Sequence, residues 1–140
     1  MKNRIFINKI MLLIPAFWAC LFDLLVTSIN QPAEYWNGDL QAGWEGNPIA
    51  DAFMKNHNLG IFIFILLWLT VVIIIGYFLR PKLFRILSLF VLIAHTWGAS
   101  TWIGEFYGFW YIIAFVLFNS IFFIIMEDRY TSKNIELEKK

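Results

Sequence analysis

The stretch that decides the fold is residues 59–79, LGIFIFILLWLTVVIIIGYFL, which contains no charged side chain. A helix rises about 1.5 Å per residue, so about 20 apolar residues cover the roughly 30 Å hydrocarbon core of a bilayer. The β-branched run at 70–75 would suggest a strand in water, but the stretch lacks the alternation of an outer-membrane barrel strand. We therefore expect a membrane-spanning helix here.

Three further stretches have similar length and character, namely residues 10–29, 86–104 and 106–126. The whole chain of 140 residues is 60% apolar and only 15% charged, which leaves too little polar surface to cover a water-soluble globule. The sequence therefore predicts an all-α fold: a four-transmembrane-helix bundle forming a single integral membrane domain over residues 1–140. The last two spans nearly touch, so we expect their turn around Glu105, bounded by Gly104 and Gly108.

The cationic side chains orient the bundle, because short cationic loops tend to stay on the cytoplasmic side of a membrane. Ten of the 11 Lys and Arg residues precede the first span, connect the second and third, or follow the fourth: Lys2, Arg4, Lys9, Arg80, Lys82, Arg85, Arg129, Lys133, Lys139 and Lys140. We predict that both termini are cytoplasmic. Acidic residues balance the cations, 10 against 11, so the chain lacks the basic field of a nucleic-acid-binding protein and no nucleic-acid partner is expected.

The long first loop, residues 30–58, contains its own helix signal. Asn47 is a good N-cap, and Pro48 suits the first helical position because its missing N–H costs nothing there. Apolar residues fall mostly on one side of residues 48–57, which predicts a short extracytoplasmic amphipathic helix. The aromatic residues of this loop, Tyr35, Trp36 and Trp44, are interpreted as interfacial anchors, with a platform for sugars or lipid headgroups as the alternative.

The N-terminal region also bears on processing, since basic residues, an apolar run and Ala19-Cys20 are features of lipoprotein signal peptides. Phe17 and the bulky Trp18 do not fit such a cleavage site, and the apolar run continues beyond Cys20. We expect this segment to remain as the first span.

Asp23 is the strongest functional signal, because a carboxylate inside a span costs several kcal/mol (about 2.5–3.5) and is functional by default. Small or polar residues share its helical face: Ala16, Ala19, Cys20, Thr27 and Asn30. Small residues allow a close helix neighbour, so this face should point into the bundle. A packing carboxylate satisfied by a neighbouring helix is the alternative.

His95 is the second residue within a span that can carry a charge near neutral pH, and it shares a face with Gly98 and Glu105. A histidine can carry a proton or ligate a metal, or it can simply form a packing hydrogen bond. Its depth is close to that of Asp23. We therefore predict that the first and third spans are adjacent and that Asp23 and His95 approach within a direct or water-mediated hydrogen bond.

Other polar residues extend this candidate site. Asn119 lies at mid-depth in the fourth span, where an interhelical hydrogen bond is the simplest interpretation. The groups Asp23, Glu45, His95 and Glu105 are weak candidates for a zinc site or an acid–base pair, and together with His57 they could converge near the outer leaflet. No complete catalytic motif is present, and no cofactor is identified from the sequence.

Three short motifs, Asp23-x-x-x-Thr27, Glu45-x-Asn47-Pro48 and Asn119 in the last span, resemble those of a family of small uncharacterised polytopic prokaryotic membrane proteins. The resemblance implies a location in a prokaryotic plasma membrane and no particular activity.

Three functional hypotheses remain from the sequence. The first is a non-enzymatic ligand-binding or accessory subunit with a buried polar site around Asp23. The second is a small membrane enzyme acting on a lipid-linked or headgroup substrate at the outer leaflet. The third is a proton-coupled transporter, which needs a homo-oligomer because four helices leave little room for two alternating states. The expected partners are membrane lipids and either another membrane protein or further copies of this chain.

Overall fold

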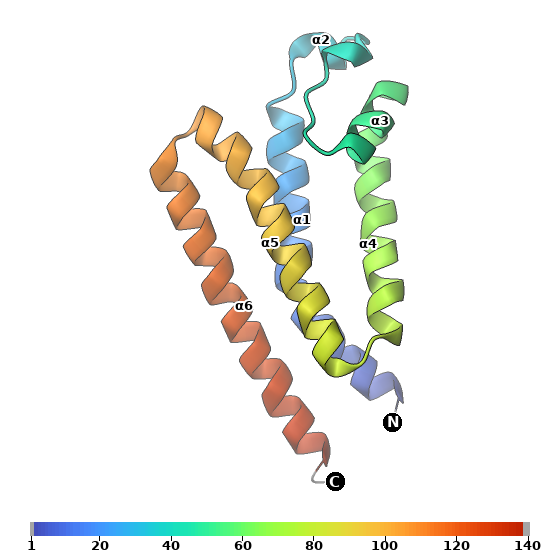
Figure 1. The fold of residues 1–140 in the computed structure, drawn as a ribbon, viewed down its shortest axis with the longest axis vertical. Helices are drawn as coiled ribbons and strands as arrows, with labels where there is room; N and C mark the ends of the chain where they lie inside the picture. The colour runs from blue at the N-terminus through green and yellow to red at the C-terminus, as the bar shows by residue number, and fades with distance from the viewer. Residues whose placement is uncertain (1, 139–140) are drawn as a thin grey trace.

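The computed structural model describes residues 2–138, and in this part of the chain the structure is all-helical without strands. Four long helices dominate: α1 (Lys2–Ile29), α4 (Gly60–Phe78), α5 (Pro81–Phe106) and α6 (Phe109–Glu138). Each contains a segment long and apolar enough to cross a membrane, so the predicted all-α fold with four such helices is confirmed. The ends of the described chain lie at one end of the bundle, and the segment between α1 and α4 lies at the other (Figure 1).

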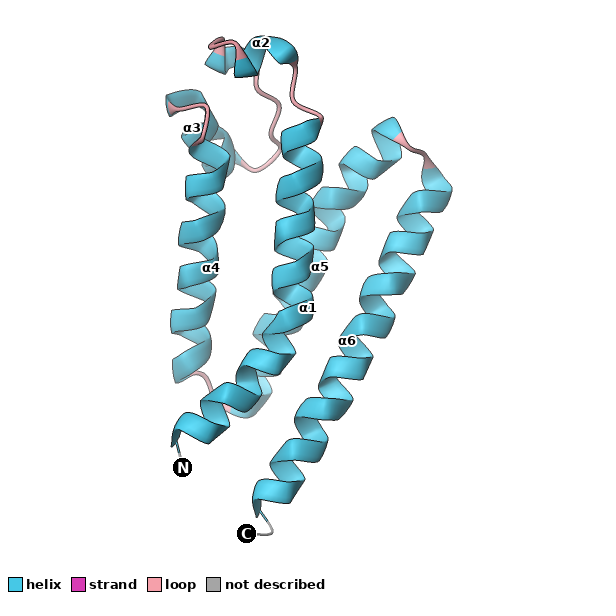
Figure 2. Ribbon diagram, turned by 180° about the vertical axis from the view of Figure 1, so that it is seen from behind, coloured by secondary structure: helices cyan, strands magenta, loops and turns pink. Residues whose placement is uncertain are grey.

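The first helix holds the bundle together, because α1 packs against α5, α6 and α4, most extensively against α5 (Figure 2). Its contact face is made of small and medium residues that are almost fully buried, including Leu12, Ala16, Ala19 and Cys20. Small side chains allow close helix approach, which is the main source of packing energy inside a bilayer. The predicted adjacency of the first and third spans is confirmed.

The helices extend beyond the predicted spans, since α1 begins eight residues before 10 and α6 ends 12 residues after 126. The third long helix begins at Pro81, five residues before the predicted 86, because Lys82 and Arg85 interrupt hydropathy without interrupting a helix. It also continues through Glu105, so the expected turn between Gly104 and Gly108 is wrong at its first boundary. The chain reverses at Tyr107 and Gly108, where Gly108 adopts a φ of 97°, a conformation suited to glycine.

The segment between α1 and α4 forms a small cap with a core of its own. It contains α2 (Ala33–Trp36), a 3₁₀ turn η1 (Leu40–Ala42) and α3 (Pro48–Asn56). The predicted cap of α3 is confirmed, since Asn47 Oδ1 accepts hydrogen bonds from the backbone N–H of Ile49 and Ala50. Gly60 allows α3 and α4 to touch, because a Cβ there would overlap the carbonyl of Phe53.

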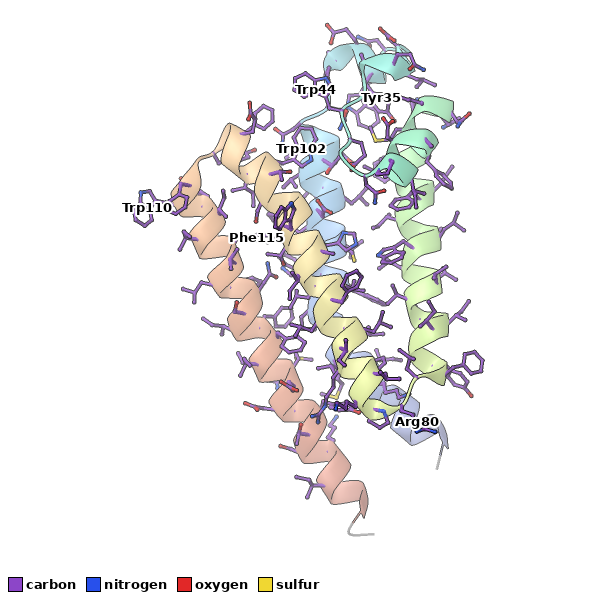
Figure 3. All side chains as sticks on the ribbon, viewed as in Figure 1. Tyr35, Trp44, Arg80, Trp102, Trp110 and Phe115 are labelled. Atoms are coloured by element: carbon purple, nitrogen blue, oxygen red, sulfur yellow. The ribbon has the colours of Figure 1, made fainter. Side chains whose placement is uncertain are left out.

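The aromatic residues of the cap do not all serve as anchors. Tyr35 is fully buried against Met54 and Ile61, and its hydroxyl donates to the carbonyl of Asn58 at 2.9 Å, so its interpretation as an interfacial anchor is wrong. Burial raises the pKa of the Tyr35 phenol. Trp36 and Trp44 are exposed as expected. Figure 3 shows Tyr35 inside the cap, whereas Trp110 projects outward at the start of α6.

Candidate functional site

The centre of the site is a contact between Asp23 and His95, the two residues of the predicted spans that can carry a charge near neutral pH. His95 Nδ1 on α5 lies 2.8 Å from Asp23 Oδ2 on α1, and their side chains are only 14% and 20% exposed. The prediction that the two residues approach within a direct or water-mediated hydrogen bond is therefore confirmed, and the contact is direct. An ionised carboxylate can only accept, so with Asp23 ionised the proton sits on Nδ1.

A glycine makes this contact sterically feasible. Gly98 lies one helical turn from His95, and a Cβ built there would stand 2.8 Å from Asp23 Oδ2 and 2.9 Å from Oδ1. Only a residue without a side chain lets the carboxylate lie against the backbone of α5. The sequence placed Gly98 on the His95 face without revealing this role.

The pair opens into a cavity of about 570 Å³ between α1, α3, α4 and α5. Aromatic side chains form much of its wall: Phe64, Trp68, Phe90, Trp97 and Trp102. The ring centroids of Trp68 and His95 are 6.3 Å apart. The cavity is of the size and mixed polarity that small-molecule sites typically have.

The third polar group of the cavity is Glu45, which comes from the cap. Its Oε1 accepts a 2.7 Å hydrogen bond from the backbone N–H of Asn47, in the turn that leads into α3. Burial raises the pKa of Glu45; the Asn47 hydrogen bond opposes that shift, and repulsion from Asp23 and Asp51 adds to it. The structure thus brings Asp23, Thr27, Glu45 and His95 to one cavity, although they come from three separate parts of the chain.

Gln31 holds the Glu45 turn in place. Its side-chain amide donates to the Trp44 carbonyl at 2.7 Å and accepts from the Trp44 N–H at 2.8 Å, while also donating to the Thr27 carbonyl at 3.1 Å. One buried side chain therefore fixes the residue next to Glu45 to the end of α1. Sequence reasoning missed Gln31, because nothing in a one-dimensional pattern pairs position 31 with position 44.

The remaining candidates lie elsewhere. Glu105 is exposed and lines a separate groove between α5 and α6, together with Asn119. Asn119 donates to the Phe115 carbonyl of its own helix at 3.1 Å and its Oδ1 has no partner among the described residues, so the expected interhelical hydrogen bond is not formed. His57 is exposed and its Nδ1 accepts from the Leu59 N–H.

The structure separates the four residues that the sequence offered as weak metal-ligand candidates, Asp23, Glu45, His95 and Glu105. Glu105 does not share the cavity of the other three, and within the described residues no group of three or more His, Cys, Asp or Glu side chains could hold a metal ion. The arrangement instead offers an imidazole oriented by a carboxylate. Since no described residue hydrogen-bonds His95 Nε2, this nitrogen is available to a molecule in the cavity.

A second buried polar residue missed in the sequence lies at the opposite end of the bundle. Lys9 is 6% exposed, and its Nζ donates to the carbonyls of Leu79 at 2.7 Å and Gly76 at 3.2 Å. These carbonyls end α4, where the helix dipole favours a cation. Lys9 therefore ties α1 to α4 and is not simply a solvated flanking charge.

Comparison with known proteins gives no further guide to function: no protein-family model, curated protein or solved structure matches this chain. What the site does must be inferred from its own geometry.

Proposed function

We propose that this chain is an integral membrane protein that binds a small ligand in the Asp23–His95 cavity, acting as a ligand-binding or accessory subunit. The observation that carries the proposal is the hydrogen-bonded Asp23–His95 pair at the wall of a ligand-sized cavity, with Glu45 brought in from the cap. A carboxylate inside the membrane is costly, so its retention beside an open cavity favours a functional role.

The proposed orientation places both termini in the cytoplasm and the α2–α3 cap on the outer side. The charges support it, because ten of the 11 cations precede the first predicted span, follow the fourth, or lie between the second and third. Lys139 and Lys140 of this set lie outside the described residues. Asp39 is exposed in the cap, so a Cys introduced there in a Cys20→Ser background should react with a membrane-impermeant maleimide from outside only. Labelling from the cytoplasmic side alone would reverse the orientation.

Filling the cavity tests ligand binding without changing a charge. Ala94 lines the cavity, so Ala94→Trp should occupy the space in which a ligand would lie. Native mass spectrometry of the purified protein with a panel of short-chain lipids, alkyl alcohols and alkylamines should show bound molecules in the natural protein and few in Ala94→Trp. Ala114→Trp, an exposed site on α6 outside the cavity, is the matched control. Equal binding by the natural protein and Ala94→Trp would refute the proposed cavity.

A second candidate function is acid–base catalysis on a lipid-linked or headgroup substrate at the outer leaflet. The observation in its favour is that Asp23 orients His95 through Nδ1, which leaves Nε2 free to move a proton. The reconstituted protein should then release headgroup fragments from vesicle lipids, and His95→Gln should abolish the release while binding in the cavity persists. Unaltered vesicle lipids after prolonged incubation would leave only the binding function.

A further inference from the structure

The charged side chains that line the cavity are mostly acidic. Two carboxylates, Asp23 and Glu45, line it, and none of the described lining residues is a Lys or Arg. With both carboxylates ionised, a protonated His95 balances Asp23, and Glu45 leaves one negative charge, whereas a neutral His95 leaves both charges. In either state the cavity is complementary to a cation.

We propose that the ligand of this cavity carries a primary ammonium group, bound between the carboxylates of Asp23 and Glu45. The inference rests on the proposed ligand-binding function and names the chemical class of the ligand. Charge-assisted hydrogen bonds from an ammonium to carboxylates are among the strong ones, and they strengthen in a site that excludes water.

The aromatic wall favours the same ligand. Three tryptophans and two phenylalanines surround the space next to the acidic groups: Trp68, Trp97, Trp102, Phe64 and Phe90. An aromatic face attracts a cation within about 6 Å of its centroid, and tryptophan does so best. An anionic ligand would meet repulsion from both the carboxylates and these rings.

An unpartnered hydroxyl gives an independent indication. Thr27 is 2% exposed and lines the cavity, and its side chain has no hydrogen bond to any residue that the structure describes. A threonine hydroxyl can accept as well as donate, so an N–H group of a ligand can supply the missing partner. A primary ammonium has three N–H donors, which Asp23, Glu45 and Thr27 can accept. A quaternary ammonium has none.

The cavity is reached from the side. Helices α4 and α5 diverge from their connection at Arg80 (Figure 3). Phe90 and Trp97 of α5 line the cavity and are also exposed on the outer surface, Trp97 to 74%. An amphiphile can therefore insert its ammonium group while its apolar part remains in the bilayer. The same chemistry is supplied by an ethanolamine lipid headgroup or by a free alkylamine.

The experiment compares matched probes bound to the full-length protein in a neutral detergent, measured by native mass spectrometry. The probes are octylamine, its quaternary N-trimethyl analogue, and octanol. Octylamine should bind at least about tenfold more tightly than octanol or the quaternary analogue, as expected for losing one charge-assisted interaction. Asp23→Asn and Glu45→Gln should each weaken octylamine binding by about tenfold, whereas Glu34→Gln, an exposed carboxylate outside the cavity, should not.

Other outcomes are equally decisive. Equal affinities of octylamine and octanol, both lost in Ala94→Trp, would overturn the ammonium inference and leave the binding cavity intact. No binding of any probe or lipid would overturn both. If Asp23→Asn does not fold, Glu45→Gln in the cap carries the test alone. Competition by short-chain phosphatidylethanolamine but not phosphatidylglycerol identifies a lipid headgroup as the source; octylamine binding without such competition identifies a free amine.

Discussion

Replacing Gly98 with alanine should break the Asp23–His95 contact without touching either residue. The added Cβ would stand 2.8 Å from Asp23 Oδ2, about 0.6 Å inside the 3.4 Å at which ordinary contact begins, and 3.1 Å from Cγ. The carboxylate sits on a short side chain of a packed helix, so it must rotate away or α1 and α5 must separate. Either movement lengthens the 2.8 Å hydrogen bond to His95.

Two opposing effects set the magnitude. Losing a hydrogen bond to a charged group costs about 1.5–3 kcal/mol, while exchanging Gly for Ala within a helix gains about 1 kcal/mol of propensity. The expected net loss in the free energy of unfolding is about 0.5–2 kcal/mol. Octylamine affinity should fall as well, because Asp23 no longer points to the same position in the cavity.

A double-mutant cycle with Asp23→Ala isolates the clash. Without the carboxylate there is nothing for the new methyl group to meet, so Gly98→Ala should become neutral or stabilising in that background, with a coupling energy of about 1–3 kcal/mol. Unfolding would be followed in mixed micelles of maltoside and dodecyl sulfate. In ¹⁵N-histidine-labelled protein, the Nδ1 resonance of His95 should shift; the chain has two histidines, so His57→Gln assigns it.

The control is Gly104→Ala on the same helix. Its Cβ would meet Ile112 Cδ1 at 3.0 Å, the flexible end of an apolar side chain that can move aside. This variant should therefore be almost as stable as the natural protein. If Gly98→Ala were equally harmless, or cost the same with and without Asp23, the reasoning about the close approach would be refuted.

Three further predictions follow from the ends of the bundle. Lys9→Met should lower the free energy of unfolding by about 1–2 kcal/mol in the same micelle titration, because the carbonyls that end α4 lose their cation. Lys55→Met, which removes only the surface ion pair between Lys55 and Asp51, should change it little. Gln31→Leu should release the turn at Trp44, seen as faster amide hydrogen exchange there and weaker octylamine binding; unchanged exchange would contradict the role of Gln31. Burial raises the pKa of Glu45, so the folded protein holds this proton more tightly than the unfolded chain does. The free energy of unfolding should therefore decrease as pH rises from the pKa of Glu45 in the unfolded chain to its higher value in the folded protein, and Glu45→Gln should flatten this slope.

The sequence predicts the parts of this molecule that the bilayer itself dictates. Apolar length locates the four long helices, because every backbone group in lipid must be satisfied within its own segment. Apolar length locates the part of each helix inside the membrane core but not the helix ends. The start of α5 at Pro81, which is followed by charged residues, was therefore not predicted. The cap of α3 at Asn47 was predictable for a similar reason, since its hydrogen bonds reach only two or three residues.

The Asp23–His95 contact was also predictable, but by elimination. Two polar side chains at similar depth, neither able to face lipid cheaply, have few places to go in a bundle of four helices. Gln31 and Tyr35 obey no such restriction, because at the membrane surface a polar group can face water. Their burial depends on partners 13 and 23 residues away, and no periodicity encodes those contacts.

Glu45 and Glu105 show where reasoning from charge alone stops. Both carboxylates belong to connections predicted on the same side of the membrane, and the sequence offers no reason to prefer one over the other as a partner of Asp23. The structure separates them through backbone geometry: Gln31 fastens the turn at Trp44 to the end of α1, which brings Glu45 over the cavity, whereas α5 slants away from α4 toward its end and carries Glu105 to the α6 side (Figure 1). Two matched substitutions test this difference. Glu105→Gln should leave octylamine affinity unchanged, whereas Glu45→Gln should lower it about tenfold. An equal loss in both variants would mean that general negative charge at this end of the bundle, and not the built cavity, attracts the amine.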